Sequence, residues 1–271
     1  MTDSEQPILI DQPEPGIHRI TLNRPDRMNA MTFAMFEALN DEFERIRYDP
    51  DVRVVVLTAT GRAFCAGADL GGMGKQPEVR EDLGKPQHHR YSMMRLGRLP
   101  ISMRSLPQPI ICAVNGSAAG AGFAMAVASD ITVMADSAKF VNAIHNAGTG
   151  TEFGMSYMLP RIIGTQRAAE ILYTTRPILA EEAARIGLVV RAVPGEQLQE
   201  EALAIARNIV ANVPLGVWLT KQALWGNQSA GSLELAMDYE HRGVYVSQSS
   251  EDAKEKRAAF IEKRQPAFRH Q

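Results

Sequence analysis

Residues 110–130 (IICAVNGSAAGAGFAMAVASD) constrain the fold of this chain more than any other segment. The first five residues form an unbroken apolar run rich in β-branched types, which predicts a strand buried on both faces. Gly116, Gly120 and Gly122 then predict a tight bend, and residues 123–128 are apolar on every side, as in a buried helix. Such a bend leaves unpaired N–H groups at the start of the helix, where an anion or a developing oxyanion can bind.

This bend differs from two common phosphate-binding loops. No Gly-Lys-Ser/Thr follows it, which excludes a P-loop, and Met125 stands at the third glycine position of a dinucleotide-binding fingerprint. On this segment alone, a close-packed strand-to-helix corner without a ligand remains an alternative.

A second segment has the same organisation. Residues 53–58 predict another buried strand, residues 66–68 (AGA) form a turn of small residues, and Asp69 stands where a helix could begin. Two such corners can each place one backbone N–H around a single carbonyl oxygen.

With these two segments the chain resembles the crotonase (enoyl-CoA hydratase/isomerase) superfamily. The matching segments follow in order along almost the whole chain: residues 23–25 (NRP) with 29–30 (NA), 64–70 (FCAGADL), 109–130, 159–164 (LPRIIG), 180–183 (AEEA) with 187–189 (GLV), and 259–263 (AFIEK). The resemblance implies an α/β fold of the ClpP/crotonase type, a spiral of strand-strand-helix units whose helical C-terminal region packs into trimers or dimers of trimers. We expect a core domain over residues 1–200 and a helical oligomerisation region over residues 201–271.

Length and composition agree with these expectations. The chain has 271 residues, of which 45% are hydrophobic, enough for one large domain with an appended region. A net charge of −2 gives no basic surface for nucleic acid, and Cys65 and Cys112 indicate neither a disulfide framework nor a zinc site. No apolar run reaches membrane-spanning length, and residues 1–7 do not resemble a signal peptide. We expect a cytoplasmic protein without nucleic-acid or membrane partners.

Apolar periodicity predicts most of the remaining elements. Strands are expected at residues 8–10 and 17–22 around a turn at 12–16, and Thr32 can cap a helix that follows it. Further helices are expected from residue 159 to Gly164, at 166–173, 180–186 and 198–209, and from about residues 215 and 232, with a strand at 188–193. Residues 71–99 are typical of a loop that enters a helix. Whether His88 and His89 in this segment contact the substrate is an open question at this point.

The resemblance also implies the site. The backbone amides of Ala68 and Ala121 match the two donors that stabilise a thioester enolate. The residues that match the coenzyme A site are Arg27, Ala66, Ala68, Asp69, Leu70, Gly71, Gly120, Ala121, Phe260 and Lys263. By themselves, Arg24 and Arg27 could equally lie in a solvated turn, and the final helix could be an ordinary amphipathic one. Coenzyme A is part of the substrate, so no metal or other cofactor is expected.

Hydratases of this family hold the attacking water with two glutamates, and here Ala124 and Ile144 stand at those positions. A third position, eight residues beyond the second, carries a carboxylate in some isomerases and related acyl-CoA enzymes, and it holds Glu152 here, although an acid before a helix can also be structural. This favours a double-bond shift in which Glu152 carries a proton between the α- and γ-carbons of a 3-enoyl-CoA, with His145 as an assistant. Hydration through Glu152 alone and a non-catalytic acyl-CoA-binding protein remain alternatives.

Overall fold

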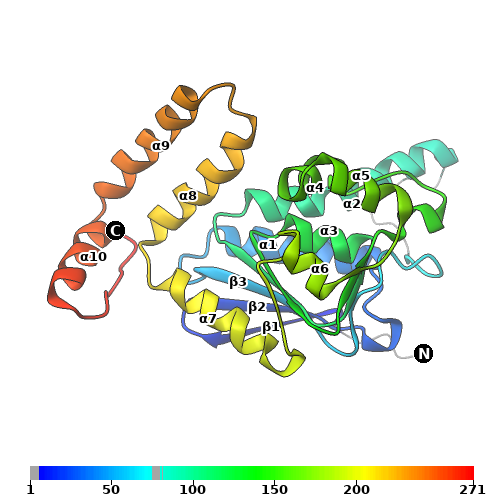
Figure 1. The fold of residues 1–271 in the computed structure, drawn as a ribbon, viewed down its shortest axis with the longest axis horizontal. Helices are drawn as coiled ribbons and strands as arrows, with labels where there is room; N and C mark the ends of the chain where they lie inside the picture. The colour runs from blue at the N-terminus through cyan, green and yellow to red at the C-terminus, as the bar shows by residue number, and fades with distance from the viewer. Residues whose placement is uncertain (1–5, 75–79, 81) are drawn as a thin grey trace.

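The computed structural model describes residues 6–74, 80 and 82–271, and it forms an α/β core from which a helical arm extends (Figure 1). The larger of two sheets has the strand order β1-β2-β3-β5-β7-β10. Its strands are β1 (Ile8–Glu14), β2 (Ile17–Leu22), β3 (Val54–Ala59), β5 (Ile110–Val114), β7 (Ile131–Ala135) and β10 (Arg191–Val193). Only β1 is antiparallel to its neighbour, so the central strands are the parallel, buried strands that the apolar runs predict.

A smaller sheet has the order β4-β6-β8-β9, in which β9 is the antiparallel strand. Its strands are β4 (Ala63–Cys65), β6 (Ser117–Ala119), β8 (Lys139–Val141) and β9 (Ile178–Leu179). The chain passes three times from the large sheet to the small sheet and then into a helix, as β3-β4-α2, β5-β6-α3 and β7-β8-α4. The expected spiral of strand-strand-helix units is therefore confirmed.

Ten α-helices, besides short 3-10 turns, complete the described part of the chain. They are α1 (Phe33–Arg47), α2 (Lys85–Ser105), α3 (Ala121–Ala128), α4 (Met155–Ile163), α5 (Thr165–Thr174), α6 (Ala180–Arg185), α7 (Leu198–Val210), α8 (Pro214–Gly226), α9 (Leu233–Gln248) and α10 (Glu251–Glu262). Helix α7 packs on the central strands of the large sheet, whereas α8, α9 and α10 form the arm that projects from the core (Figure 1). The expected division at residue 200 falls inside α7.

Local sequence accounts for the elements that carry the site. All five residues of β5 and all eight of α3 are buried, as the apolar run predicts. The hydroxyl of Thr32 accepts a hydrogen bond from the Met35 amide at 3.3 Å, which caps α1 and confirms that prediction. Phe36, Leu39 and Phe43 then place one face of α1 in the core.

Four local expectations were wrong or incomplete. Strand β1 runs through the expected turn to Glu14, because a bulge before its partner Ile17 absorbs the extra residues. Strand β10 begins only at Arg191, and α4 begins at Met155, one turn earlier than expected, with Pro160 inside it. No helix begins at Asp69, where the chain forms a turn instead. The expected loop before α2 includes residues 75–79 and 81, which lie outside the described residues.

A buried ion pair fixes the arm to the core. The ammonium group of Lys221 on α8 lies 2.8 Å from Oδ2 of Asp130 and donates to the carbonyl oxygens of Gln108 and Met103 at 2.9 and 3.2 Å. Burial lowers the pKa of Lys221, and Asp130 opposes that effect. In the part of the chain that the structure covers, no single helix is both long and apolar enough to cross a membrane. One pair of helices, Gly195–Val210 and Pro214–Ser229, is long and apolar enough when taken together, but the pair is bent by 108°.

Replacing Lys221 by methionine tests the anchor. Lys221→Met keeps the stem of the side chain but leaves Asp130 buried without its cation, so we expect a loss of about 3–5 kcal/mol in the free energy of unfolding. Lys254→Met is the control, because the Lys254–Glu251 pair is exposed and contributes about 1 kcal/mol or less. Denaturant unfolding of both variants measures the difference, and equal stability of the two would show that the anchor is unimportant.

Candidate active site

The first bend of the candidate site follows β4. The segment of residues 28–31 pairs with it on one side: the amides of Ala66 and Asp69 donate to the carbonyls of Met28 and Met31, and the Met31 amide donates to the Gly67 carbonyl. This pairing turns the amide of Ala68 to the opposite side. No described residue accepts a hydrogen bond from it, so the Ala68 N–H is available to a ligand.

The second bend joins β6 to α3. Gly120 has φ 49° and ψ −114°, a conformation in which a side chain is strained, and its amide donates to the Val141 carbonyl at 3.2 Å. Ala121 is the first residue of α3, and its amide has no acceptor among the residues described. The positive end of the helix dipole lies at the same point, so this second free N–H also favours a negatively charged oxygen.

Glycines bring the backbones of the two bends into contact. A Cβ atom on Gly67 would lie 3.3 Å from the carbonyl oxygen of Ala119, and one on Gly120 would lie 3.5 Å from the Cα of Gly67. One on Gly122 would lie only 2.6 Å from both the Cβ and the carbonyl oxygen of Cys65. The free amides of the first and second bends therefore sit on adjacent backbones.

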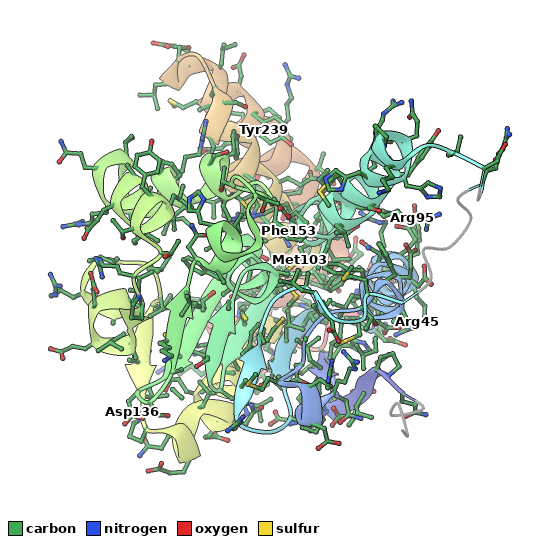
Figure 2. The ribbon with its side chains drawn as sticks, turned by 90° about the vertical axis from the view of Figure 1, so that its right-hand side faces the viewer. Arg45, Arg95, Met103, Asp136, Phe153 and Tyr239 are labelled. Atoms are coloured by element: carbon green, nitrogen blue, oxygen red, sulfur yellow. The ribbon has the colours of Figure 1, made fainter. Side chains whose placement is uncertain are left out.

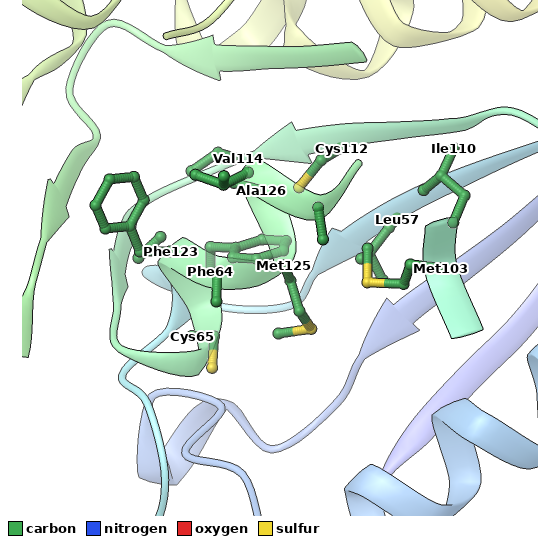
Figure 3. Packing of buried hydrophobic residues seen from close by; sticks show 14 of the residues in the cluster. Leu57, Phe64, Cys65, Met103, Ile110, Cys112, Val114, Phe123, Met125 and Ala126 are labelled. Carbon is green, nitrogen blue, oxygen red and sulfur yellow. The ribbon is translucent and has the colours of Figure 1, made fainter. Parts of the chain in front are cut away.

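Cys65 lies beneath both bends, next to the core residues of α3 (Figure 3). Its sulfur accepts a hydrogen bond from the Gly67 amide at 3.4 Å. Burial raises the pKa of the Cys65 thiol to about 12, although hydrogen bonds from the Gly67 and Gly122 backbones oppose this shift. The thiol is thus an uncharged support for the bends rather than a nucleophile.

Asp69 holds the first bend from the other side. Its carboxylate accepts hydrogen bonds from Nη1 of Arg24 at 2.7 Å and from the Gly71 amide at 3.2 Å, and Nη2 of Arg27 lies 3.5 Å away. The hydrogen bond from Arg24 is the main reason why the pKa of Asp69 is lowered. The Arg24 side chain is 15% exposed and that of Arg27 57%, so the prediction that singled out Arg27 missed the closer partner of Asp69.

The remaining residues expected around the first bend differ in exposure. Ala66 and Ala68 are half-buried, whereas Leu70 and Gly71 are exposed, and the side chain of Leu70 is 77% exposed. Leu70 lies two residues after the free Ala68 amide, so its exposed side chain is available for contact with a ligand bound there.

Glu152 lies between β8 and α4 and is half-buried. Its side chain makes no hydrogen bond or ion pair with any described residue, whereas its carbonyl oxygen accepts from the Met155 amide. The next residue, Phe153, packs near Ala121 around a small apolar void. The fold therefore brings the Glu152 segment beside the second bend.

The two positions where hydratases carry glutamates are apolar and buried. Ala124 is 2% exposed and borders the same small void, and Ile144 is 7% exposed. Neither side chain can hold a water molecule by hydrogen bonds.

The three histidines considered earlier have different surroundings. Nε2 of His145 lies 2.9 Å from the carbonyl oxygen of Leu172, which can only accept, so this nitrogen carries the proton. His145 is therefore engaged in binding α5. His88 is half-buried and His89 exposed in the first turns of α2.

Phe260 and Lys263 are not brought to the bends within one chain. Both lie at the end of α10, where Phe260 is 82% exposed, and Figure 1 places α10 at the end of the molecule remote from α2 and α3. The physical reason is that the arm extends from the core instead of folding back over it. Within the described ranges, no group of three or more metal-binding side chains is found.

Comparisons with known proteins agree with this geometry. The sequence model of the family described as Enoyl-CoA hydratase/isomerase matches residues 12–271. A probable enoyl-CoA hydratase of Mycobacterium bovis is 45% identical over 263 residues, which cover 96% of this chain and 92% of that protein.

Two solved structures support the same fold. The crystal structure of a probable enoyl-CoA hydratase/isomerase from Mycobacterium abscessus has a TM-score of 0.90 and 41% identity, covering 97% of this chain and 99% of the other. A monofunctional enoyl-CoA isomerase from M. smegmatis has a TM-score of 0.72 and 39% identity, covering 85% and 98%.

Substituting Gly122 tests the contact between the bends. In Gly122→Ala the new methyl group overlaps Cys65, so the bends must move apart, and we expect a loss of about 1–3 kcal/mol in stability. Gly97→Ala on α2 is the control, since nothing lies within 4 Å of its added Cβ and an alanine there favours the helix by about 1 kcal/mol. Equal free energies of unfolding for Gly122→Ala and wild type would contradict the tight packing.

Proposed function

The chain belongs to the enoyl-CoA hydratase/isomerase family, and on that basis we propose that it isomerises 3-enoyl-CoA thioesters with Glu152 as its acid and base. The observation that supports this most directly is the contrast between Glu152 and the two hydratase positions. Glu152 is a half-buried carboxylate without a protein partner among the described residues, whereas the two hydratase positions hold the apolar Ala124 and Ile144. One carboxylate suffices to move one proton, but nothing apolar can activate water.

The free amides supply the second part of the proposed mechanism. Removal of the α-proton turns the thioester into an enolate, whose oxygen would accept hydrogen bonds from Ala68 and Ala121. Each donor in comparable oxyanion holes contributes roughly 3 kcal/mol to the transition state. Because both donors are backbone groups fixed by packed glycines, they need little reorganisation when the charge develops.

The proton then returns to a different carbon. Glu152 would remove a proton from the α-carbon, the double bond would shift to the α,β position as the enolate collapses, and protonated Glu152 would deliver the same proton to the γ-carbon. Atoms and charge balance without water or an added reductant. The reaction needs no cofactor other than the coenzyme A carried by the substrate, and both cysteines are free, which suits the cytoplasm in which we propose that the enzyme acts.

Coenzyme A would lie along the first bend. Arg27, Leu70 and Gly71 are exposed there, and Arg27 offers a cation for a phosphate group. Ala66 and Gly120 would contact the ligand through their backbones, and Asp69 would keep the bend in place. Phe260 and Lys263 would reach the adenine end only from the arm of a neighbouring subunit, since their own arm points away.

Hydration is the second candidate, and the similarity to a probable enoyl-CoA hydratase supports it. In that reaction Glu152 alone would have to activate the water and protonate the α-carbon. An acyl-CoA-binding protein without turnover is the third. Two separate assays distinguish these activities: one follows the conjugation of 3-enoyl thioesters, and the other follows the formation of the 3-hydroxy product. Tight thioester binding with neither product would indicate the binding protein.

The central prediction concerns Glu152. In Glu152→Gln we expect isomerisation to fall by about 100-fold or more, because general acid–base catalysis contributes that much, while thioester affinity changes little. Glu170→Gln, which alters an exposed carboxylate paired with Arg176, is the matched control and should keep full turnover. Stopped assays of kcat together with calorimetric Kd values measure both effects, and unchanged kcat in Glu152→Gln would refute the assignment.

A second prediction concerns the homotrimer or dimer of trimers that we propose. Helix α9 has no fully buried residue, although it carries exposed Leu235, Tyr245 and Val246, so a partner surface is needed to cover it. We expect a mass of about three or six times 29.8 kDa by light scattering. Tyr245→Asp should shift the mass toward the monomer, and Tyr173→Asp, an equally exposed tyrosine on α5, should not. A monomeric wild type would overturn the proposal.

A further inference from the structure

Phe153 has an unusual backbone conformation directly beside the candidate base. Its φ of 53° lies in the left-handed region, which bulky side chains rarely adopt, and Gly154 follows with φ 73°. These two residues form the turn between Glu152 and α4. A strained residue persists only where its surroundings hold it, so the ring of Phe153 must have contacts that offset the strain.

The ring of Phe153 is stacked on a residue from a distant part of the chain. Phe36 of α1 lies parallel to it, with 5.9 Å between ring centroids and 4° between ring planes. Phe36 is 1% exposed, so the close-packed core around it fixes its position. The stack thus ties the turn beside Glu152 to a buried position of α1.

The same end of α1 also holds the first bend. Met31 is buried and forms a parallel β-bridge with Ala68. Thr32 then caps α1, and the Phe36 amide donates to the Thr32 carbonyl at 3.1 Å, which closes the first turn of the helix. The residue that pairs with the Ala68 backbone and the residue that stacks on Phe153 therefore belong to one short, hydrogen-bonded segment.

The second bend lies near Phe153 as well. Ala121, whose amide is the second candidate donor, borders the same small apolar void as Phe153. Figure 2 shows Phe153 next to Met103 of α2, which borders this void too. The void is too small for a water molecule, so a movement of the Phe153 ring is limited by the helices around it.

The proposed proton transfer needs this order, because it depends on where the carboxylate lies relative to the bound thioester. The two free amides would fix the thioester oxygen and thereby the reacting carbons. The side chain of Glu152 has no hydrogen bond or ion pair with any described residue, so its place depends on the backbone of its own turn. A displacement of about 1 Å can lower the rate about 100-fold.

We propose that Phe153 is a positioning residue, whose stack on Phe36 sets the place of Glu152 relative to the two free amides. The inference rests on the proposed function, because it needs Glu152 to be the acid and base. It applies to isomerisation and to hydration through Glu152 alike, since both require the carboxylate at the reacting carbons.

The test measures kcat for the product that wild type forms, together with thioester Kd and binding stoichiometry by calorimetry. The variants are Phe153→Leu, Phe36→Leu and the double variant, all in the full chain. Each single substitution removes the ring stack but keeps an apolar side chain, so we expect kcat to fall about 10- to 100-fold. Kd and stoichiometry should change by less than about twofold, which shows that the molecules are folded and bind. Because both substitutions remove one contact, the double variant should be no more than about threefold slower than the slower single variant.

Phe43→Leu is the matched control. Phe43 is a fully buried phenylalanine on the core face of the same helix, roughly 10 Å along the helix axis from Phe36. Its substitution should lower the thermal stability as Phe36→Leu does, because both remove a buried ring. We expect kcat of Phe43→Leu to stay within about twofold of wild type, whereas a merely structural role of the stack predicts equal losses in the two variants.

Different results overturn different claims. Wild-type kcat in a folded Phe153→Leu, an equal loss in Phe43→Leu, or losses that multiply in the double variant would refute the positioning role. A rise of Kd in parallel with the fall of kcat would refute it too, because the ring would then bind the substrate. These results leave the proposed function standing as long as Glu152→Gln is slow. A wild type without turnover, or wild-type kcat in Glu152→Gln, would instead overturn the proposed function and the positioning role with it.

Discussion

The candidate site depends on the backbone contact between two bends of the chain. Gly67, Gly120 and Gly122 let the turn after β4 and the start of α3 approach so closely that a Cβ atom at Gly122 would lie 2.6 Å from Cys65. Hydrogen-bond donors fixed in this way keep their positions when the side chains around them change. Ala121 can therefore offer its amide whatever its side chain, because the side chain takes no part in donating the hydrogen bond.

This separation between fixed donors and variable side chains explains how the chemistry can change within one fold. In the proposed reaction the enolate would be stabilised by backbone groups, whereas the fate of the proton would depend on which carboxylates surround it. With Ala124 and Ile144 at the two hydratase positions, the side chains there are apolar and buried. In the proposed reaction this substitution would remove the activation of water and leave Glu152 as the acid and base.

Much of the fold could be predicted because the signals are local. The buried run in residues 110–128 and the cap at Thr32 depend on neighbours within a few residues, and both were found as expected. The pairing of Asp69 with Arg24 joins residues 45 positions apart, and nothing in either local sequence selects Arg24 over Arg27. The left-handed conformation of Phe153 likewise depends on stacking with the distant Phe36, so local propensity argues against it. The position of Phe260 depends on the direction of the whole arm.

Helix α3 links the arm to the site because both of its ends are fixed. Its first residue belongs to the second bend, and near its last turn Nη2 of Arg104 donates to the carbonyl of Val127 at 2.6 Å. The guanidinium of Arg104 lies 3.1 Å from the ring centroid of Trp225, and Trp225 donates to Asp130, the carboxylate that also binds the arm through Lys221. Burial lowers the pKa of Arg104 to about 10, so this cation stays charged at neutral pH. Because α3 is only eight residues long, the contacts of Trp225 and Arg104 lie close to the Ala121 amide at its other end. The arm is thus connected to the second bend through a short chain of packed and hydrogen-bonded groups.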